Sequence, residues 1–122
     1  MIAGGTVTIY VSDMDRAVRF YTETLGLTLK ARGGPGYAAL DGGKGFEIGL
    51  HGVHPGGPRP GPGGSMSVGF YVDEPIGQVA ERLRAAGVAV DGPKAGGGPI
   101  QLAHFGDPDG NPLYLCEVTP QP

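Results

Sequence analysis

The hexapeptide T-V-T-I-Y-V, Thr6–Val11, occurs a second time 61 positions later as S-V-G-F-Y-V, Ser67–Val72. The correspondence extends beyond the hexapeptides, because acidic residues and a helical pattern follow each of them and Gly26 falls on Gly87. Such a repeat in a chain of 122 residues predicts two halves of similar structure. A half of this size cannot enclose a core alone, so we expect the halves to pack together with a cleft between them.

The first half is predicted to fold as β-α-β-β-β. Thr6–Val11 alternates apolar and polar side chains, which is typical of a half-buried strand. Ser12 and Asp13 can cap a helix whose apolar residues follow a 3.6-residue period as far as Gly26. Three short strands, separated by glycine-rich turns, are expected at about Leu27–Arg32, Tyr37–Asp41 and Phe46–His51.

The second half is predicted to repeat this order. Residues 52–64, G-V-H-P-G-G-P-R-P-G-P-G-G, read as a linker between a first module at about 5–51 and a second at about 65–118. Ser65–Val72 opens the second module, and an apolar helical stripe runs from Pro75 to Gly87. The remaining strands are expected at about Val88–Val90, Ile100–Phe105 and Leu113–Val118. We interpret residues 1–122 as one α+β domain in which the two modules form a curved mixed sheet with helices on its outer face.

Composition and charge exclude several classes of partner. The formal net charge is −3 and no basic patch is evident, which argues against nucleic acid as a partner. No apolar run approaches 18 residues, so a membrane-spanning role is not expected. The single cysteine, Cys116, cannot form an internal disulfide and fits a reducing, cytoplasmic location.

The strand faces opposite the helices carry the candidate binding residues. Side chains alternate along a strand, so these faces bear tyrosines with small residues beside them. The candidate ligand-binding residues are Thr6, Thr8, Tyr10, Glu47, His51, Ser67, Tyr71, Tyr114 and Cys116. Aromatic surfaces with a few polar groups suit a small organic ligand, which we expect as the partner.

Two further stretches make the chain resemble a known family. These are V-S-D-M-D-R-A-V-R-F-Y-T-E-T-L-G-L, Val11–Leu27, and F-G-D-P-D-G-N, Phe105–Asn111. Together with the doubled β-α-β-β-β unit, they resemble the vicinal oxygen chelate superfamily, which includes glyoxalase I, bleomycin-resistance proteins, fosfomycin-resistance enzymes and extradiol dioxygenases. The resemblance covers almost the whole chain and implies the fold, whereas the family hosts many activities on that fold.

The resemblance also implies where a metal would bind. Metal-dependent members use a His on the first strand of each half and a Glu or His on the last strand, and these positions map to Thr6, Ser67, Glu47 and Tyr114. Only Glu47 is a conventional ligand, because neutral hydroxyls and a phenol bind divalent metals poorly. His51 lies four residues from Glu47, roughly 13 Å along a strand, so the two cannot share an ion. We therefore predict no metal site at these positions and no cofactor, and neither His54 nor His104 can be assigned to a replacement site.

Several candidate residues allow a functional and a structural interpretation. In the functional interpretation, Glu47 is a remnant metal ligand, a catalytic base or an anchor for a cationic ligand. In the structural interpretation, it is a partly solvated carboxylate on a strand. The tyrosines either form a stacking platform or fill the core. His51 is an acid–base group or a polar residue at the cleft edge, and Cys116 is a nucleophile or a small buried hydrophobic residue.

Three hypotheses for the function follow. The first is a binding protein similar to bleomycin-resistance proteins, which sequesters a small organic ligand unchanged. The second is a glyoxalase- or dioxygenase-like enzyme, a lyase, isomerase or oxygenase with a divergent metal site or with Glu47 as base. The third is a regulatory subunit that binds another protein. The resemblance further implies a homodimer, since family members of this length usually build their clefts from two chains.

Overall fold

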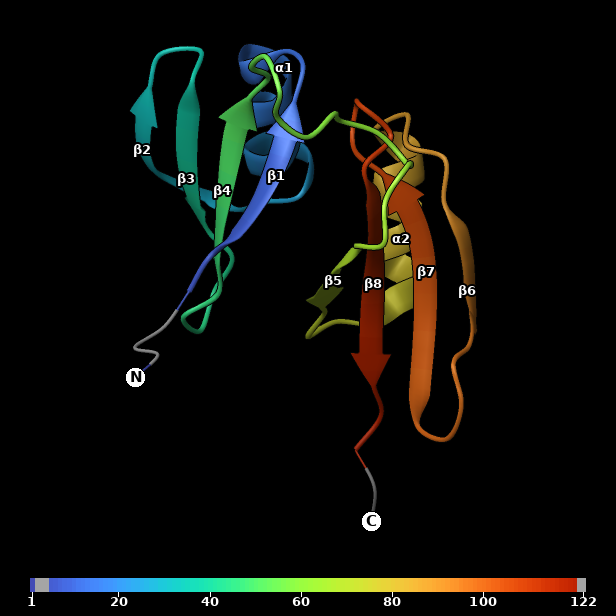
Figure 1. Ribbon diagram of the computed structural model, residues 1–122. Coiled ribbons are helices and arrows are strands. Elements are labelled where there is room, and N and C mark those ends of the chain that lie inside the picture. Colours follow the sequence, from blue (N-terminus) through green and yellow to red (C-terminus); the bar gives the residue numbers. More distant parts are fainter. Residues whose placement is uncertain (2–4, 121–122) are drawn as a thin grey trace. The chain divides into compact units, whose positions relative to one another are not determined.

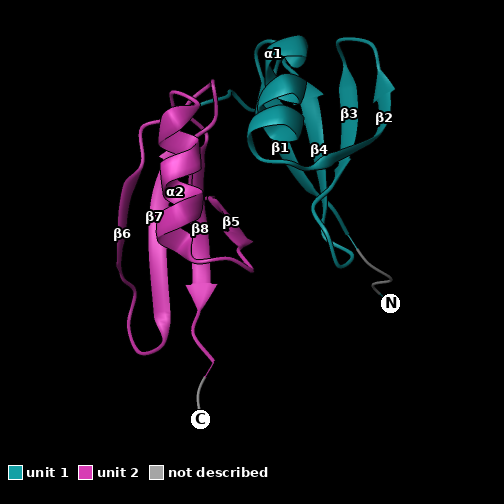
Figure 2. Cartoon of the chain, turned by 180° about the vertical axis from the view of Figure 1, so that it is seen from behind, with its two compact units in different colours: residues 1–61 teal, residues 62–122 magenta. Residues whose placement is uncertain are grey.

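The computed structural model describes residue 1 and residues 5–120 of the chain. The chain divides into two compact units, Met1–Gly61 and Pro62–Pro122 (Figure 2). The division falls inside the glycine- and proline-rich stretch 52–64 that the sequence indicates as a linker. No helix in the described part of the chain has the length and apolarity needed to cross a membrane.

The first unit is a four-stranded sheet covered on one face by a helix (Figures 1 and 2). Its elements are β1 (Val7–Val11), α1 (Met14–Arg19), the π-helical turn η1 (Phe20–Thr24), β2 (Thr28–Gly33), β3 (Tyr37–Asp41) and β4 (Glu47–Gly52). The strand order is β1-β4-β3-β2; β1 runs parallel to β4, and the other pairs are antiparallel.

The second unit repeats this topology. Its elements are β5 (Val68–Tyr71), α2 (Ile76–Ala85), β6 (Asp91–Ala95), β7 (Ile100–Gly106) and β8 (Pro112–Val118). The strand order β5-β8-β7-β6 matches that of the first unit, again with a single parallel pair, β5 with β8. The α+β fold class and the doubled β-α-β-β-β order predicted from the sequence are therefore confirmed.

The cores of the two units form between each helix and the facing strand residues. In the first unit Ile48 and Leu50 of β4, the strand against which α1 packs, are fully buried, and Tyr21 of η1 is fully buried as well. In the second unit Ala80 and Leu83 of α2 and Leu113 of β8 are buried in the same way. The apolar face of each sheet thus points toward its helix, which leaves the opposite face for other roles.

Local signals explain where the helices begin and end. The Asp13 carboxylate accepts a hydrogen bond from the Arg16 amide at 3.0 Å, so Asp13 caps α1 as the sequence predicts. Gly26 follows η1 with a φ of 79°, and Gly87 follows α2 with a φ of 89°. Both glycines adopt the left-handed conformation that commonly terminates helices.

One predicted strand is wrong. Val88–Val90 lies outside the sheet, and β6 begins only at Asp91, which pairs with His104. The Val88 amide donates to the Leu83 carbonyl and the Gly87 amide donates to Arg84, which closes the end of α2. Because Val88 is committed to the helix terminus, the chain reaches the sheet three residues later than its β-branched composition indicates.

Candidate functional site

Each sheet has a helix-distal face, by which we mean the side of the sheet that points away from its own helix. In the first unit this face carries Thr8, Tyr10, Tyr37, Glu47, Gly49 and His51. In the second unit it carries Gly69, Tyr71, His104, Tyr114 and Cys116. Seven of the nine predicted ligand-binding residues lie on these two faces. The other two, Thr6 and Ser67, are exposed residues just before β1 and β5.

Three aromatic rings gather at one end of the first helix-distal face. Tyr10 and His51 are paired across β1 and β4, and their ring centroids are 5.2 Å apart. His54, in the segment after β4, lies 5.9 Å from the Tyr10 ring and 5.5 Å from the His51 ring. These contacts leave Tyr10 half-buried and bring together two predicted residues, Tyr10 and His51, with one that had not been assigned to the site.

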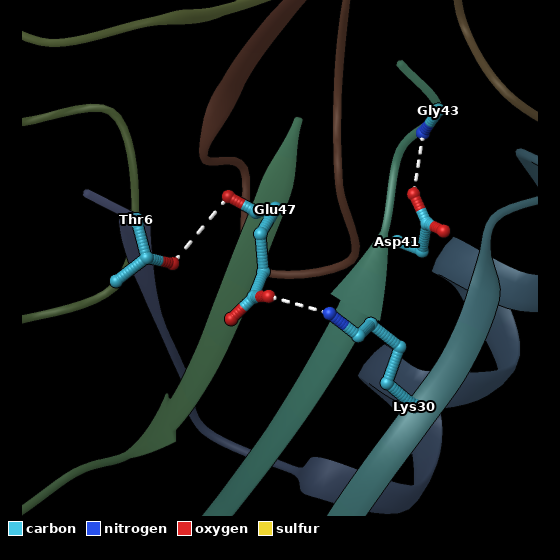
Figure 3. Close-up of polar contacts among 5 residues, drawn as sticks. All are labelled: Thr6, Lys30, Asp41, Gly43 and Glu47. Carbon is cyan, nitrogen blue, oxygen red and sulfur yellow. Dashed lines mark hydrogen bonds and ion pairs between the residues drawn. The ribbon is translucent and has the colours of Figure 1, made fainter. Parts of the chain in front are cut away.

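Glu47 of β4 forms an ion pair with Lys30 of β2, which lies two strands away in the same sheet (Figure 3). The Lys30 ammonium donates a hydrogen bond to the Glu47 carboxylate at 2.7 Å, and the Glu47 side chain is 35% exposed. The hydrogen bond and the charge of Glu47 raise the pKa of Lys30 above its usual value. A catalytic carboxylate base is normally withdrawn from water and from neutralising cations, and Glu47 is neither.

The contact between Thr6 and Glu47 involves the backbone of Glu47. The Thr6 hydroxyl donates to the Glu47 carbonyl oxygen at 3.4 Å, a long bond that ties the start of β1 to β4 (Figure 3). Asp41, on β3 opposite Glu47, accepts a hydrogen bond from the Gly43 amide at 2.8 Å. Both interactions stabilise strand ends and turns, and neither directs a hydroxyl toward the Glu47 carboxylate.

On the second helix-distal face, the Tyr114 ring packs over Gly69. The two residues are paired between β8 and β5, and a Cβ on Gly69 would come within 2.6 Å of the Tyr114 hydroxyl oxygen. The Tyr114 ring also contacts His104 of β7, with centroids 5.8 Å apart. Tyr114 is therefore half-buried and held in place from two sides.

Tyr71 differs from the other tyrosines in being 83% exposed. It ends β5, the edge strand of the second sheet, and is paired there with Cys116. Cys116 is a half-buried free thiol. The nucleophile interpretation of Cys116 gains nothing from this position, because its cross-strand neighbours on β5 and β7 are Tyr71 and Leu102, neither of which is a base.

The strand registers show that Glu47 and Tyr114 do not occupy equivalent positions. Val7 pairs with Ile48 in the first unit, and its repeat Val68 pairs with Leu113 in the second. The residue before Ile48 is Glu47, whereas the residue before Leu113 is Pro112. Tyr114 instead corresponds to Gly49. The second unit thus has proline, which offers no metal-binding side chain, where the first unit has its carboxylate.

The metal site implied by the family resemblance does not fit these side chains. Glu47 is neutralised by Lys30, and the Thr6 hydroxyl is bonded to a backbone carbonyl. Ser67 and Tyr114 would contribute a neutral hydroxyl and a phenol, which are weak ligands for divalent transition metals. Within residues 1 and 5–120, no group of three or more His, Cys, Asp or Glu side chains is arranged to hold a metal ion.

A surface depression of about 520 Å³ occurs elsewhere in the second unit. It lies at the hairpin between β6 and β7, where Lys94, Gln101 and Thr119 contribute to its lining. None of the nine predicted ligand-binding residues lines it. Lys94 is paired with Asp91 at 2.8 Å, so its charge is already compensated.

Sequence reasoning missed four residues at or next to the helix-distal faces: Lys30, Tyr37, His54 and His104. Tyr37 alternates with Ala39 and Asp41 in a correctly predicted strand, so strand periodicity alone could have placed it on the helix-distal face, although its pairing with His51 depends on the register. Lys30 could not be placed, because the register of β2 shifts between Leu29 and Ala31. The position of His54 depends on a loop conformation that composition does not determine.

A family profile described as "Glyoxalase/Bleomycin resistance protein/Dioxygenase superfamily" matches residues 5–115. The chain belongs to this superfamily. No curated protein matches the chain significantly. The membership confirms the resemblance inferred from Val11–Leu27 and Phe105–Asn111, and it agrees with the two four-stranded mixed sheets described above.

Solved structures of other proteins resemble the chain over nearly its full length. TnmS3, an antibiotic-binding protein from Streptomyces sp. CB03234, is 31% identical with a TM-score of 0.79, covering 98% of this chain and 100% of its own. A glyoxalase/bleomycin resistance protein from the same organism is also 31% identical, with a TM-score of 0.73 and coverages of 93% and 98%. Virulence protein STM3117 from Salmonella typhimurium is 29% identical, with a TM-score of 0.74 and coverages of 98% and 100%.

Proposed function

We propose that the protein binds a small organic ligand on its helix-distal faces and sequesters it without changing it chemically. The ligand would contact the tyrosine-bearing helix-distal faces, with threonine, serine and histidine side chains fixing its orientation. In this proposal Thr6, Thr8, Tyr10, Glu47, His51, Ser67, Tyr71, Tyr114 and Cys116 contribute to the binding surface.

The observation that carries the proposal is the aromatic surface left on the helix-distal faces. Tyr71 is 83% exposed and Tyr37 is 39% exposed, so both rings present aromatic surface to solvent. Tyr37 and Tyr114 each pack over a glycine of the adjacent strand, Gly49 and Gly69, and both rings remain partly exposed to solvent as surfaces for stacking. Such surfaces are typical of sites for small organic ligands.

Similarity to TnmS3 supports the same function. That protein is described as antibiotic-binding, and its likeness to this chain extends over 98% of the sequence at 31% identity. The superfamily also contains enzymes, so membership alone does not decide between binding and catalysis. Binding is favoured because Glu47 is solvent-accessible and paired with Lys30, which is an unsuitable environment for a general base.

We also propose that the protein is a cytoplasmic homodimer. Strands β1 and β2 form the edges of the first sheet, and β5 and β6 form those of the second. Edge strands present unpaired backbone groups that favour association with another strand or chain. The unpaired thiol of Cys116 is compatible with a reducing compartment.

The proposal can be tested with a panel of aromatic antibiotics. Binding would be detected by calorimetry, and the ligand recovered from the complex would be compared by mass spectrometry with the starting material. We expect at least one compound to bind and to be recovered unchanged. Conversion of the compound by the wild-type protein would contradict the proposal.

Tyr71 provides the matched variants for this test. Because Tyr71 makes few contacts within its unit, Tyr71→Ala should fold normally and yet weaken binding by about 1–3 kcal/mol, as expected for one lost aromatic contact. Tyr71→Phe keeps the ring and should retain most of the affinity. Equal affinities for wild type and Tyr71→Ala would exclude this ring from the binding surface.

A further inference from the structure

His51 and His54 form a pair of imidazoles at the end of β4, within the sequence H-G-V-H. Their ring centroids lie 5.5 Å apart, and the rings are inclined by 73°. Two imidazoles that share one tetrahedral zinc ion, with Zn–N distances of about 2.0–2.1 Å, have centroids about 5 Å apart. The spacing of the two rings is therefore close to that of a shared metal ion.

Both rings have their Nδ1 atoms engaged with the backbone. The Nδ1 of His51 lies 2.7 Å from the Gly52 carbonyl oxygen, and the Nδ1 of His54 lies 3.3 Å from that of Pro55. A carbonyl only accepts hydrogen bonds, so Nδ1 carries the proton when each ring is neutral. The lone pair is then on Nε2 in both rings, which is the arrangement that backbone carbonyls impose on metal-ligating histidines.

Gly57 provides the space occupied by the His54 ring. A Cβ on Gly57 would lie 2.8 Å from the His54 Nδ1 and even closer to Cε1 and Nε2. The Gly57 amide also donates to the His54 carbonyl at 3.1 Å, closing a turn around the histidine. The conformation that presents His54 to His51 therefore requires glycine at position 57.

We propose that His51 and His54 form a two-histidine site for a divalent cation of the zinc class, bound through the two Nε2 atoms. Tyr10 packs against both rings, at 5.2 and 5.9 Å, and acts as a positioning residue. Imidazole suits zinc, copper and nickel, whereas Mg²⁺ and Ca²⁺ require oxygen ligands. Water completes the coordination, so the ion would remain accessible to an additional ligand.

This site is separate from the positions at which the superfamily resemblance places a metal. It uses neither Thr6 nor Glu47, and the register places His51 opposite Tyr10, four residues beyond Glu47 along β4. The inference does not depend on the proposed binding of an organic ligand. Failure of zinc binding would leave that proposal unchanged, because the antibiotic panel tests it without added metal.

The test is a calorimetric titration of the full-length protein with Zn²⁺, combined with NMR correlation spectra of the histidine imidazoles. We expect one Zn²⁺ per chain, and zinc-dependent shifts at the Nε2 atoms of His51 and His54. His51→Gln and His54→Gln should each weaken binding by at least about tenfold, because each removes one of two protein ligands.

Gly57→Ala and His104→Gln are the controls. Gly57→Ala keeps both histidines but displaces the His54 ring, and it should also weaken zinc binding at least about tenfold. His104 is an exposed histidine of the second unit, so His104→Gln should bind Zn²⁺ as the wild type does. Absence of zinc binding to the wild type, or unchanged affinity in either His51→Gln or His54→Gln, would overturn the proposal.

Discussion

Tyr10 and Tyr71 correspond in the repeat, yet their surroundings differ. Tyr10 is paired with His51 and packed against His54, whereas Tyr71 is paired with Cys116 and is 83% exposed. The difference arises from single residues on the strand paired with each tyrosine. In the first unit these are His51 on β4 and His54 in the loop after it, and in the second unit the residue is Cys116 on β8. A duplicated framework has thus acquired one restrained and one accessible tyrosine, and only the accessible ring can give most of its surface to a ligand.

A substitution at the single residue Glu47 can distinguish ligand binding from catalysis. Replacing it by Gln removes the ion pair with Lys30 but preserves side-chain shape. Since both side chains of the pair are partly exposed to solvent, we expect Glu47→Gln to fold with little loss of stability and to bind an uncharged ligand as the wild type does. Binding would be measured by calorimetry, with Lys30→Gln as the matched control. A product formed by wild type and absent with Glu47→Gln would instead identify Glu47 as a catalytic base.

At the scale of single elements, the close contact between β5 and β8 depends on a glycine. A Cβ at Gly69 would overlap the Tyr114 ring, whereas a Cβ at Gly49, on the other sheet, would lie 3.4 Å from the nearest Tyr37 atom. We expect Gly69→Ala to lower the free energy of unfolding by about 1–3 kcal/mol through overpacking, and Gly49→Ala to cost less. Chemical denaturation of both variants would measure this difference. Equal losses would show that Tyr114 can move aside without cost.

The start of α2 is capped by a residue from a different element. Pro75 offers no side-chain cap, and the Ile76 amide instead donates to the Glu117 carboxylate of β8 at 2.8 Å. We expect Glu117→Ala to destabilise the protein by about 1 kcal/mol, the usual effect of removing a helix cap. Thermal unfolding would test this, with Glu81→Ala on the exposed face of α2 as control. An equal effect of the two substitutions would contradict a capping role for Glu117.

For the molecule as a whole, the repeat of Thr6–Val11 at Ser67–Val72 predicted that both halves share one order of strands and helix, and the structure confirms that order. It worked because the strand alternation and the glycine-terminated helices are local features that both halves share. The site was less predictable, because its contacts depend on register and loop conformation. The bulge between Leu29 and Ala31 determines whether Lys30 can reach Glu47, and the turn containing Gly57 determines where His54 lies. Neither feature produces a periodic pattern in the sequence.

The proposed homodimer is also tested at this scale. Each sheet has two edge strands, and association through a symmetric pair would satisfy part of their unpaired backbone groups. We therefore expect light scattering at micromolar concentration to give twice the chain mass of 12.4 kDa. Edge pairing depends mainly on backbone hydrogen bonds and apolar contacts, so the dimer should persist at high salt, where charge pairs between exposed residues are screened. A monomer at micromolar concentration in both low and high salt would refute the proposed dimer. A dimer that dissociates only when salt is added would instead show that the contact is made by charged surface residues and not by the strand edges.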